Sequence, residues 1–76
     1  MKRLRSLRNE KCMTQYQLGE KAHVSQAYIN ELENGRKKNP SISILDKLAK
    51  ALGVTTSELI DEDEPLWKHN FKKQAG

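Results

Sequence analysis

Apolar residues recur at helical spacing in five separate stretches of the chain, with polar residues between them. The second and third stretches lie within residues 14–34, and their apolar positions are Leu18, Ala22, Val24, Ile29 and Leu32. Spacings of three and four residues put such side chains on one face of a helix. Because only about three residues connect the two runs, the second helix must cross the first steeply, which is typical of a helix-turn-helix.

Hydroxyl residues mark the start of four of the predicted helices, at Thr14, Ser25, Ser41 and Thr55. A Ser or Thr side chain at this position accepts a hydrogen bond from an unpaired backbone N–H. Gln17 and Glu58 stand three residues after two of these caps and complete capping boxes. Apolar pairs also frame three caps as hydrophobic staples: Met13 with Leu18, Val24 with Ile29, and Val54 with Leu59. The agreement of these local signals predicts an all-α fold.

The remaining stretches predict three more helices. Residues 2–11 form the first, with Leu4 and Leu7 inward, and a short fifth helix covers about 56–61. The fourth helix follows Ser41, with inward positions at Ile42, Leu45, Leu48, Ala49 and Leu52. Gly35 and Gly53 end two helices, whereas Cys12 occupies an end where a left-handed glycine is usual. We therefore expect a compact five-helix bundle over residues 1–61, followed by a tail, 62–76, that is flexible or part of a dimer contact.

Composition favours a partner of negative charge and excludes several kinds of site. The net charge is +4. Residues 1–60 hold 11 Lys and Arg against 6 Asp and Glu, a difference of +5 that suits a polyanion such as DNA. The single cysteine, Cys12, permits no internal disulfide, which fits a cytoplasmic protein, and no run is long enough to span a membrane. Cys12, His23 and His69 lack metal-ligand spacing. Since no nucleophile–base set is present either, we expect no enzyme, metal or cofactor.

As a set, residues across positions 3–60 resemble the Xre family, the phage repressor and Cro-like group of bacterial and phage DNA-binding domains. The residues that carry the resemblance are Arg8, Thr14, Gln15, Leu18, Val24, Ser25, Gln26, Ile29, Leu32–Arg36, Pro40, Ser41, Leu45, Leu48, Ala49, Ala51–Val54 and Leu59. The resemblance implies a lambda-repressor-like domain whose third helix enters the major groove, usually as a homodimer on a palindromic operator. Two positions depart from the family: Gly19 replaces a usual alanine and His23 a usual glycine. The resemblance therefore implies a positive φ at His23, which histidine tolerates better than most residues. We expect Gly19 to weaken its helix by up to about 1 kcal/mol relative to alanine.

The third helix, residues 26–34, is the predicted recognition helix, because its outward side chains suit base edges. The expected base contacts are Gln26, Ala27, Asn30 and Glu31. The expected phosphate contacts are Gln15, Tyr28, Asn34, Arg36, Lys37 and Lys38. The alternative for each of these side chains is an ordinary solvated surface.

Two further sets of residues are assigned structural roles. Glu33 falls about 40° from Ile29 around the helix, so it is half-buried and wants a partner. The family resemblance pairs it with Arg8. The expected dimer surface comprises Leu59, Ile60, Leu66 and Trp67.

These features predict a sequence-specific transcriptional regulator, a repressor acting as a homodimer on double-stranded DNA. An alternative is the antitoxin or protein-interaction module of a toxin–antitoxin pair, with the C-terminal tail as the docking segment for a protein partner. A restriction–modification controller protein is a further alternative, since it has this size and fold by resemblance.

Overall fold

Five helices make up the part of the chain that the structure, a computed structural model, describes, which is residues 1–60. They are α1 (Lys2–Glu10), α2 (Gln15–Ala22), α3 (Gln26–Glu33), α4 (Ile42–Leu52) and α5 (Thr56–Ile60). The predicted all-α, five-helix fold is confirmed. Each predicted boundary agrees to within one residue where the structure describes it. Asp61 and the predicted tail, 62–76, lie outside the described residues.

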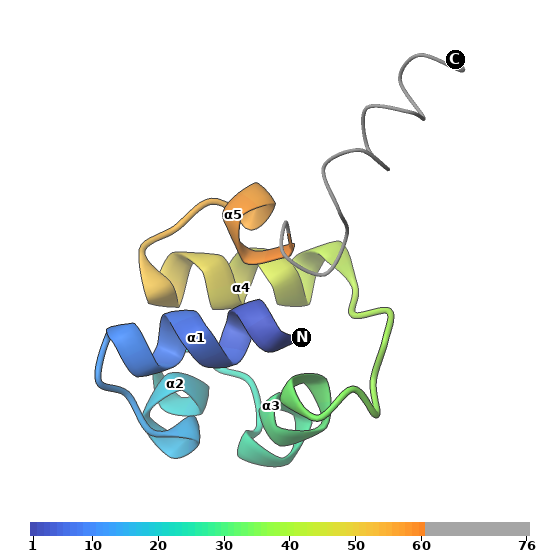
Figure 1. The fold of residues 1–76 in the computed structure, drawn as a ribbon, viewed down its shortest axis with the longest axis horizontal. Helices are drawn as coiled ribbons and strands as arrows, with labels where there is room; N and C mark the ends of the chain where they lie inside the picture. Colours follow the sequence, from blue (N-terminus) through green and yellow to red (C-terminus); the bar gives the residue numbers. More distant parts are fainter. Residues whose placement is uncertain (61–76) are drawn as a thin grey trace.

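The helices pack so that α3 lies at one side of the bundle (Figure 1). In this view α1 and α4 run across the molecule, α2 and α3 lie below α1, and α5 lies above α4. The main contacts join α2 to α3 and α4, α1 to α3 and α5, and α4 to α5. Because α3 is held mainly by α1 and α2, its opposite side is left facing outward.

One apolar core joins all five helices. Its fully buried large side chains are Leu4, Leu18, Ile29, Leu32, Leu48, Leu52 and Leu59. Two predictions about this core are wrong. Ile42 does not face inward but is 77% exposed, because it is the first residue of α4, and Ile44 packs against the core instead. Leu59 is not available for a dimer surface, because its side chain is 0% exposed and joins α5 to the protomer's own core.

The predicted caps fix where the helices begin. At each one the hydroxyl oxygen accepts a hydrogen bond from the backbone N–H three residues on, over 3.0–3.2 Å. These caps are Thr14, Ser25, Ser41 and Thr55. In turn, the side-chain oxygens of Gln17 and Glu58 accept hydrogen bonds from the backbone N–H groups of Thr14 and Thr55, so both capping boxes are confirmed. The direction in which α3 leaves the turn is therefore set by local chemistry.

In the turn between α2 and α3 the backbone passes close to Gly19 of α2. His23 adopts the left-handed conformation with φ 59°, as expected, and Cys12 does so with φ 57° after α1. A Cβ added to Gly19 would lie 2.6 Å from the carbonyl oxygen of Val24. The expected advantage of alanine at this position does not hold here, because an alanine side chain has no room beside that carbonyl.

Candidate nucleic-acid interface

The outward edge of α3 borders an open hollow. Gln26 and Ala27 are exposed at its N-terminal end, and Asn30 and Glu31 are half-buried one turn further on. These four side chains line a hollow of about 430 Å³ together with Gln15 from α2 and Arg36 from the following loop. The structure thus brings together all four predicted base contacts and two of the predicted phosphate contacts.

Sequence reasoning missed Tyr16, an aromatic side chain beside this edge. Tyr16 is 59% exposed, although it is a large ring on α2. It lines a second hollow with Gly19, His23 and Gln26, so it lies close to the N-terminal end of α3. Its place one residue after Gln15, near the start of α2 and outside the apolar stripe, is the signal that could have identified it.

Glu33 is the centre of a charged cluster behind α3. Arg8 grips its carboxylate with two nitrogens: Nε lies 2.7 Å from Oε2, and Nη2 lies 3.0 Å from Oε1. Arg8 also donates to the carbonyl of Met13 over 2.7 Å, which ties α1 to the start of α2. The Glu33 side chain is 0% exposed and that of Arg8 is 13% exposed. A two-point pair of this kind is directional, so it fixes α3 against α1.

The surroundings of Glu33 keep it ionised. Burial alone raises its pKa, but hydrogen bonds from Arg8 and Gln15 and the charge of Arg8 outweigh burial and hold the pKa below its ordinary value. The hydrogen bonds that Arg8 donates to Glu33 raise the pKa of Arg8, although burial opposes this shift. A buried carboxylate that keeps its charge needs all of these partners.

A ring of amide side chains links Glu33 to the outward edge of α3. Gln15 donates from Nε2 to Glu33 Oε1 over 3.1 Å, and Asn30 donates from Nδ2 to Gln15 Oε1 over 3.3 Å. Asn34 donates from Nδ2 to Asn30 Oδ1 over 3.0 Å. Arg5 closes the ring, with Nη2 2.9 Å from Asn34 Oδ1 and Nε 3.4 Å from Glu33 Oε1. The ring thus has five members, namely Glu33, Gln15, Asn30, Asn34 and Arg5. The sequence analysis did not predict that the three amides are joined, or that Arg5 takes part.

The ring limits how many hydrogen bonds Gln15 and Asn34, two of the predicted phosphate contacts, can make to a ligand. An amide group has two N–H donors and two acceptor lone pairs. The ring uses one donor and one lone pair on Gln15 and on Asn34. Each therefore keeps a second N–H for a ligand, while its orientation is decided inside the protein.

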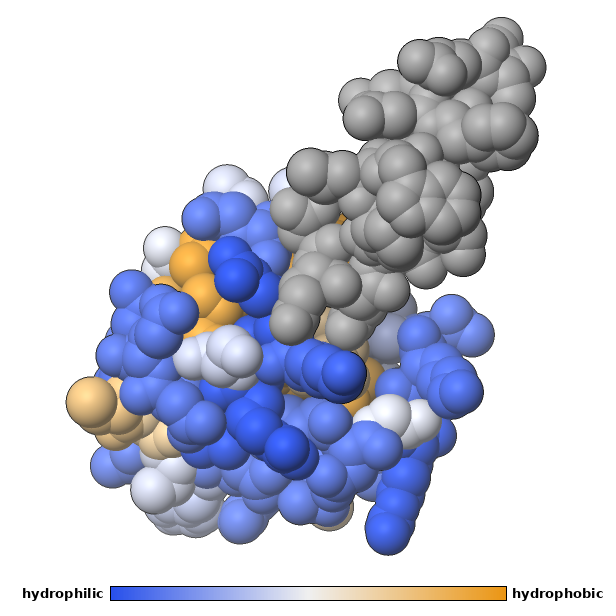
Figure 2. Space-filling model, viewed as in Figure 1, coloured by the Kyte–Doolittle hydropathy of each residue, from blue (hydrophilic) through white to orange (hydrophobic). Residues whose placement is uncertain are grey.

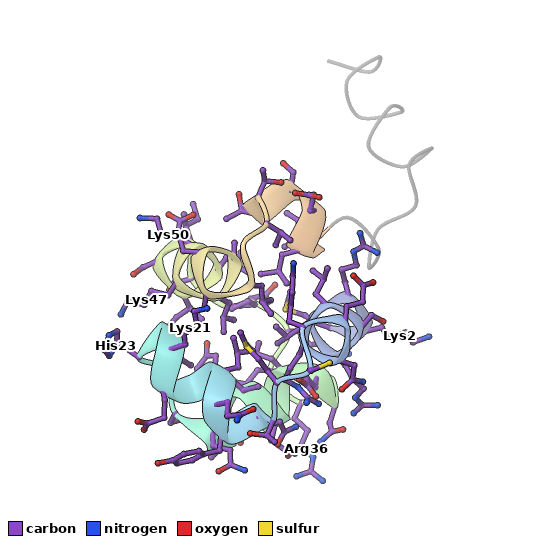
Figure 3. All side chains as sticks on the ribbon, turned by 90° about the vertical axis from the view of Figure 1, so that its left-hand side faces the viewer. Lys2, Lys21, His23, Arg36, Lys47 and Lys50 are labelled. Atoms are coloured by element: carbon purple, nitrogen blue, oxygen red, sulfur yellow. The ribbon has the colours of Figure 1, made fainter. Side chains whose placement is uncertain are left out.

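Outside α1 and the residue that follows it, the cationic side chains of the described chain gather at two separate places. Arg36, Lys37 and Lys38 are exposed in the loop after α3, and the ammonium of Lys37 lies 5.6 Å from the centroid of the Tyr28 ring. Figure 3 shows Arg36 on the α3 side of the molecule and a second group on the α2–α4 side. This second group, Lys21, Lys47 and Lys50, borders a hollow of about 260 Å³ together with His23. Only the first group adjoins the predicted recognition helix.

The view in Figure 2 shows a largely hydrophilic face over α1 and the helices below it. Within residues 1–60, no group of three or more His, Cys, Asp or Glu residues is placed to hold a metal ion. Over the same range, no helix is both long and apolar enough to cross a membrane.

Of the predicted dimer residues, Ile60 is 36% exposed, whereas Leu66 and Trp67 lie outside the described residues.

Comparison with known proteins identifies the domain. A family model described as helix-turn-helix matches residues 4–59, which is most of the chain. The chain belongs to the Xre-type helix-turn-helix family. Its sequence is 40% identical to that of the immunity repressor protein of Bacillus phage phi105, over 95% of this chain and 52% of that protein. It is also 37% identical to the transcriptional regulator SinR of Bacillus subtilis strain 168, over 79% of this chain and 54% of SinR.

A solved structure agrees with this helix-turn-helix assignment. The SinR–SinI complex superposes with a TM-score of 0.77 at 30% identity, covering 97% of this chain and 75% of that one. The lambda-repressor-like fold is therefore confirmed. One of the two relatives is named as a repressor and the other as a transcriptional regulator. The predicted helix-turn-helix DNA-binding domain is confirmed by the family match. This chain spans about half the length of those two relatives.

Proposed function

We propose that this protein represses transcription by binding a palindromic operator as a homodimer, with one α3 in the major groove of each half-site. The observation that carries the proposal is the open edge of α3, where Gln26 and Ala27 are exposed and the bordering hollow holds every predicted base contact. Helix-turn-helix domains dock with the N-terminal residues of the second helix against base edges. The family membership of residues 4–59 supports the same docking mode.

Base recognition would come from three kinds of side chain on this edge. The amides of Gln26 and Asn30 can each bridge N6 and N7 of adenine. Ala27 is small and apolar, which suits contact with a thymine methyl group. Glu31 can accept a hydrogen bond from cytosine N4, and it repels phosphate elsewhere. The hollow that these residues line lies between α2 and the loop after α3, where a base edge would approach.

Phosphate contacts would flank this edge on both sides. On one side lie the exposed Arg36, Lys37 and Lys38, with Lys37 held over Tyr28. On the other side the free backbone N–H groups at the start of α2, beginning at Gln15, attract an anion. Asn34 keeps one N–H for the same purpose, and the hydroxyl of Tyr28 can donate to a phosphate or sugar oxygen.

Dimerisation would place the two recognition helices in successive major grooves about 34 Å apart. The exposed Ile60 at the end of α5 supports a contact there. Leu66 and Trp67 follow in the tail and would extend an apolar surface. Since Leu59 is buried in the protomer, it takes no part in this proposal.

Selection of bound sequences from a random DNA pool tests the proposal. We expect two inverted half-sites centred one helical turn apart. Gln26→Ala should then relax the preference at one position in each half-site and weaken binding by about 1–3 kcal/mol. Enrichment of no common sequence, or of an unrepeated half-site only, would contradict the homodimeric operator.

The salt dependence of operator binding tests where the phosphates lie. Replacing Lys37 and Lys38 with glutamine should flatten the slope of log K against log salt by about 1.8 per protomer, if each neutralises one phosphate. Replacing Lys47 and Lys50 with glutamine makes the same change in net charge on the other side of the domain and should leave the slope nearly unchanged (Figure 3). Equal changes in both double variants would reject the proposed docking face.

A further inference from the structure

The hydrogen bonds of the amide ring run in one direction only. A carboxylate can only accept, so Gln15 must turn its Nε2 group toward Glu33. Its Oε1 then faces Asn30 and must receive a donor, which fixes Nδ2 of Asn30 on that side. A guanidinium can only donate, so Arg5 fixes Oδ1 of Asn34 at the other end. Both ends of the series are therefore set by ions.

An isolated rotation of the Asn30 amide would break this order. Oδ1 of Asn30 would face Oε1 of Gln15, an acceptor against an acceptor. Nδ2 of Asn30 would face Nδ2 of Asn34, a donor against a donor. Two hydrogen bonds, of 3.3 Å and 3.0 Å, would thus be exchanged for two repulsive contacts. One amide orientation is favoured, and the groups that impose it lie outside the recognition surface.

We propose that Arg5 is a specificity-determining positioning residue, which orients the amide of Asn30 toward the base through Asn34. Arg5 stands on α1 and its side chain is half exposed, so nothing in its own position suggests a part in base recognition. It acts only through its bonds to Asn34 and Glu33. This inference rests on the proposed function, since it assumes that Asn30 meets a base.

The orientation matters because adenine offers one acceptor, N7, and one donor, N6, side by side. An amide with a fixed orientation presents its own acceptor and donor in one order along the groove. A reversed amide places its oxygen against the acceptor N7 and its NH2 group against the donor N6, so an amide that turns freely discriminates less strongly in favour of adenine. Removal of Arg5 frees Asn34 and leaves the single 3.3 Å bond to Gln15 as the restraint on the Asn30 amide, so discrimination should fall at the one base that Asn30 reads, and at no other.

The experiment compares Arg5→Met with Arg3→Met. Arg3 lies on the same helix, but its Nε donates to the backbone carbonyl of Glu58 over 3.0 Å, so it stands outside the ring. Both variants lose one positive charge and one α1 arginine. The base read by Asn30 is first identified as the position whose preference Asn30→Ala removes. Binding is then measured to operators that carry each of the four bases there.

A good two-point contact to a base discriminates by roughly 5- to 150-fold. We expect Arg5→Met to reduce discrimination at the Asn30 position at least fivefold, and to leave preferences elsewhere within twofold. Arg3→Met should leave all preferences unchanged. Uniform weakening by Arg5→Met with unchanged preferences would overturn the inference and make Arg5 a phosphate contact only.

A second measurement needs no DNA. In the free protein, the side-chain NH2 signals of Asn30 and Asn34 should shift together in Arg5→Met and stay in place in Arg3→Met. Unmoved signals in Arg5→Met would show that the ring does not control these amides, and would also overturn the inference. Failure of the unmodified protein to select any DNA sequence would instead count against the proposed function.

Discussion

Gly19→Ala tests whether tertiary contact or helix propensity decides stability in the helix-turn-helix. Alanine is worth about 1 kcal/mol more than glycine inside a helix. Its Cβ would, however, lie 2.6 Å from the Val24 carbonyl oxygen, where ordinary contact begins at 3.4 Å. Val24 is 7% exposed, and its N–H donates to the Gly19 carbonyl over 3.0 Å, so the two backbone segments are held close together and the contact is costly to relieve. Overpacking of this kind costs about 1–3 kcal/mol. The sum predicts a variant that is about 0–2 kcal/mol less stable, rather than more stable.

Denaturant unfolding followed by circular dichroism measures this change, and Glu20→Gly supplies its control. Glu20 is the next residue of α2 and is exposed, so its replacement by glycine reports the propensity effect without a steric contact. We expect Glu20→Gly to cost roughly 0.5–1 kcal/mol. If Gly19→Ala stabilised the protein by as much as Glu20→Gly destabilises it, the steric reasoning would be refuted. A gain of 1 kcal/mol would also raise the melting temperature by about 4–8 °C, which a thermal scan would detect.

Two further predictions concern single residues of the same framework. His23→Gly should stabilise the protein by about 1 kcal/mol in the same unfolding assay, because His23 has φ 59° and glycine adopts this conformation without strain; a loss of stability would mean that the imidazole makes a contact worth more than the strain. The pKa of Glu33 is lower in the folded state than its ordinary value of 4.5, so the unfolded chain binds its proton first as pH falls. The stability that ionised Glu33 contributes should therefore be complete above about pH 5 and decline through the lower folded pKa. The difference in unfolding free energy between the unmodified protein and Glu33→Gln, measured from pH 6 to 2, should shrink over that range, whereas a constant difference would contradict the shift.

Much of this fold could be predicted from the sequence because its signals are local. The cap at Ser25 involves a hydroxyl and an N–H only three residues away, at Tyr28, so the sequence contains both partners side by side. The left-handed conformation of His23 was expected from the glycine that the resembled family has at this position, and its φ of 59° agrees. The core faces of α2 and α3 follow from spacing alone, since Leu18 and Ile29 are both fully buried.

The rest depended on distances between helices, which no spacing along the chain provides. The outward edge of α3 could be predicted, but the bond from Arg5 to Asn34 spans 29 residues of sequence. Gly19 was judged by propensity, whereas the Val24 carbonyl that excludes a side chain is set by the crossing of two helices. Leu59 was assigned to a dimer surface, whereas its burial depends on the packing of α5 against α1 and α4.

The packing of α5 against α1 has a consequence for how the protein is made. Arg3 and the carbonyl of Glu58, which are joined by a hydrogen bond, are separated by 55 residues. Closing a loop of that length costs about 3.5 kcal/mol of chain entropy beyond a constant. During synthesis α1 can meet α3 earlier, but it cannot complete the burial of its apolar side until residue 59 has left the ribosome. The domain is therefore expected to fold after its last helix is released, as one cooperative event rather than helix by helix.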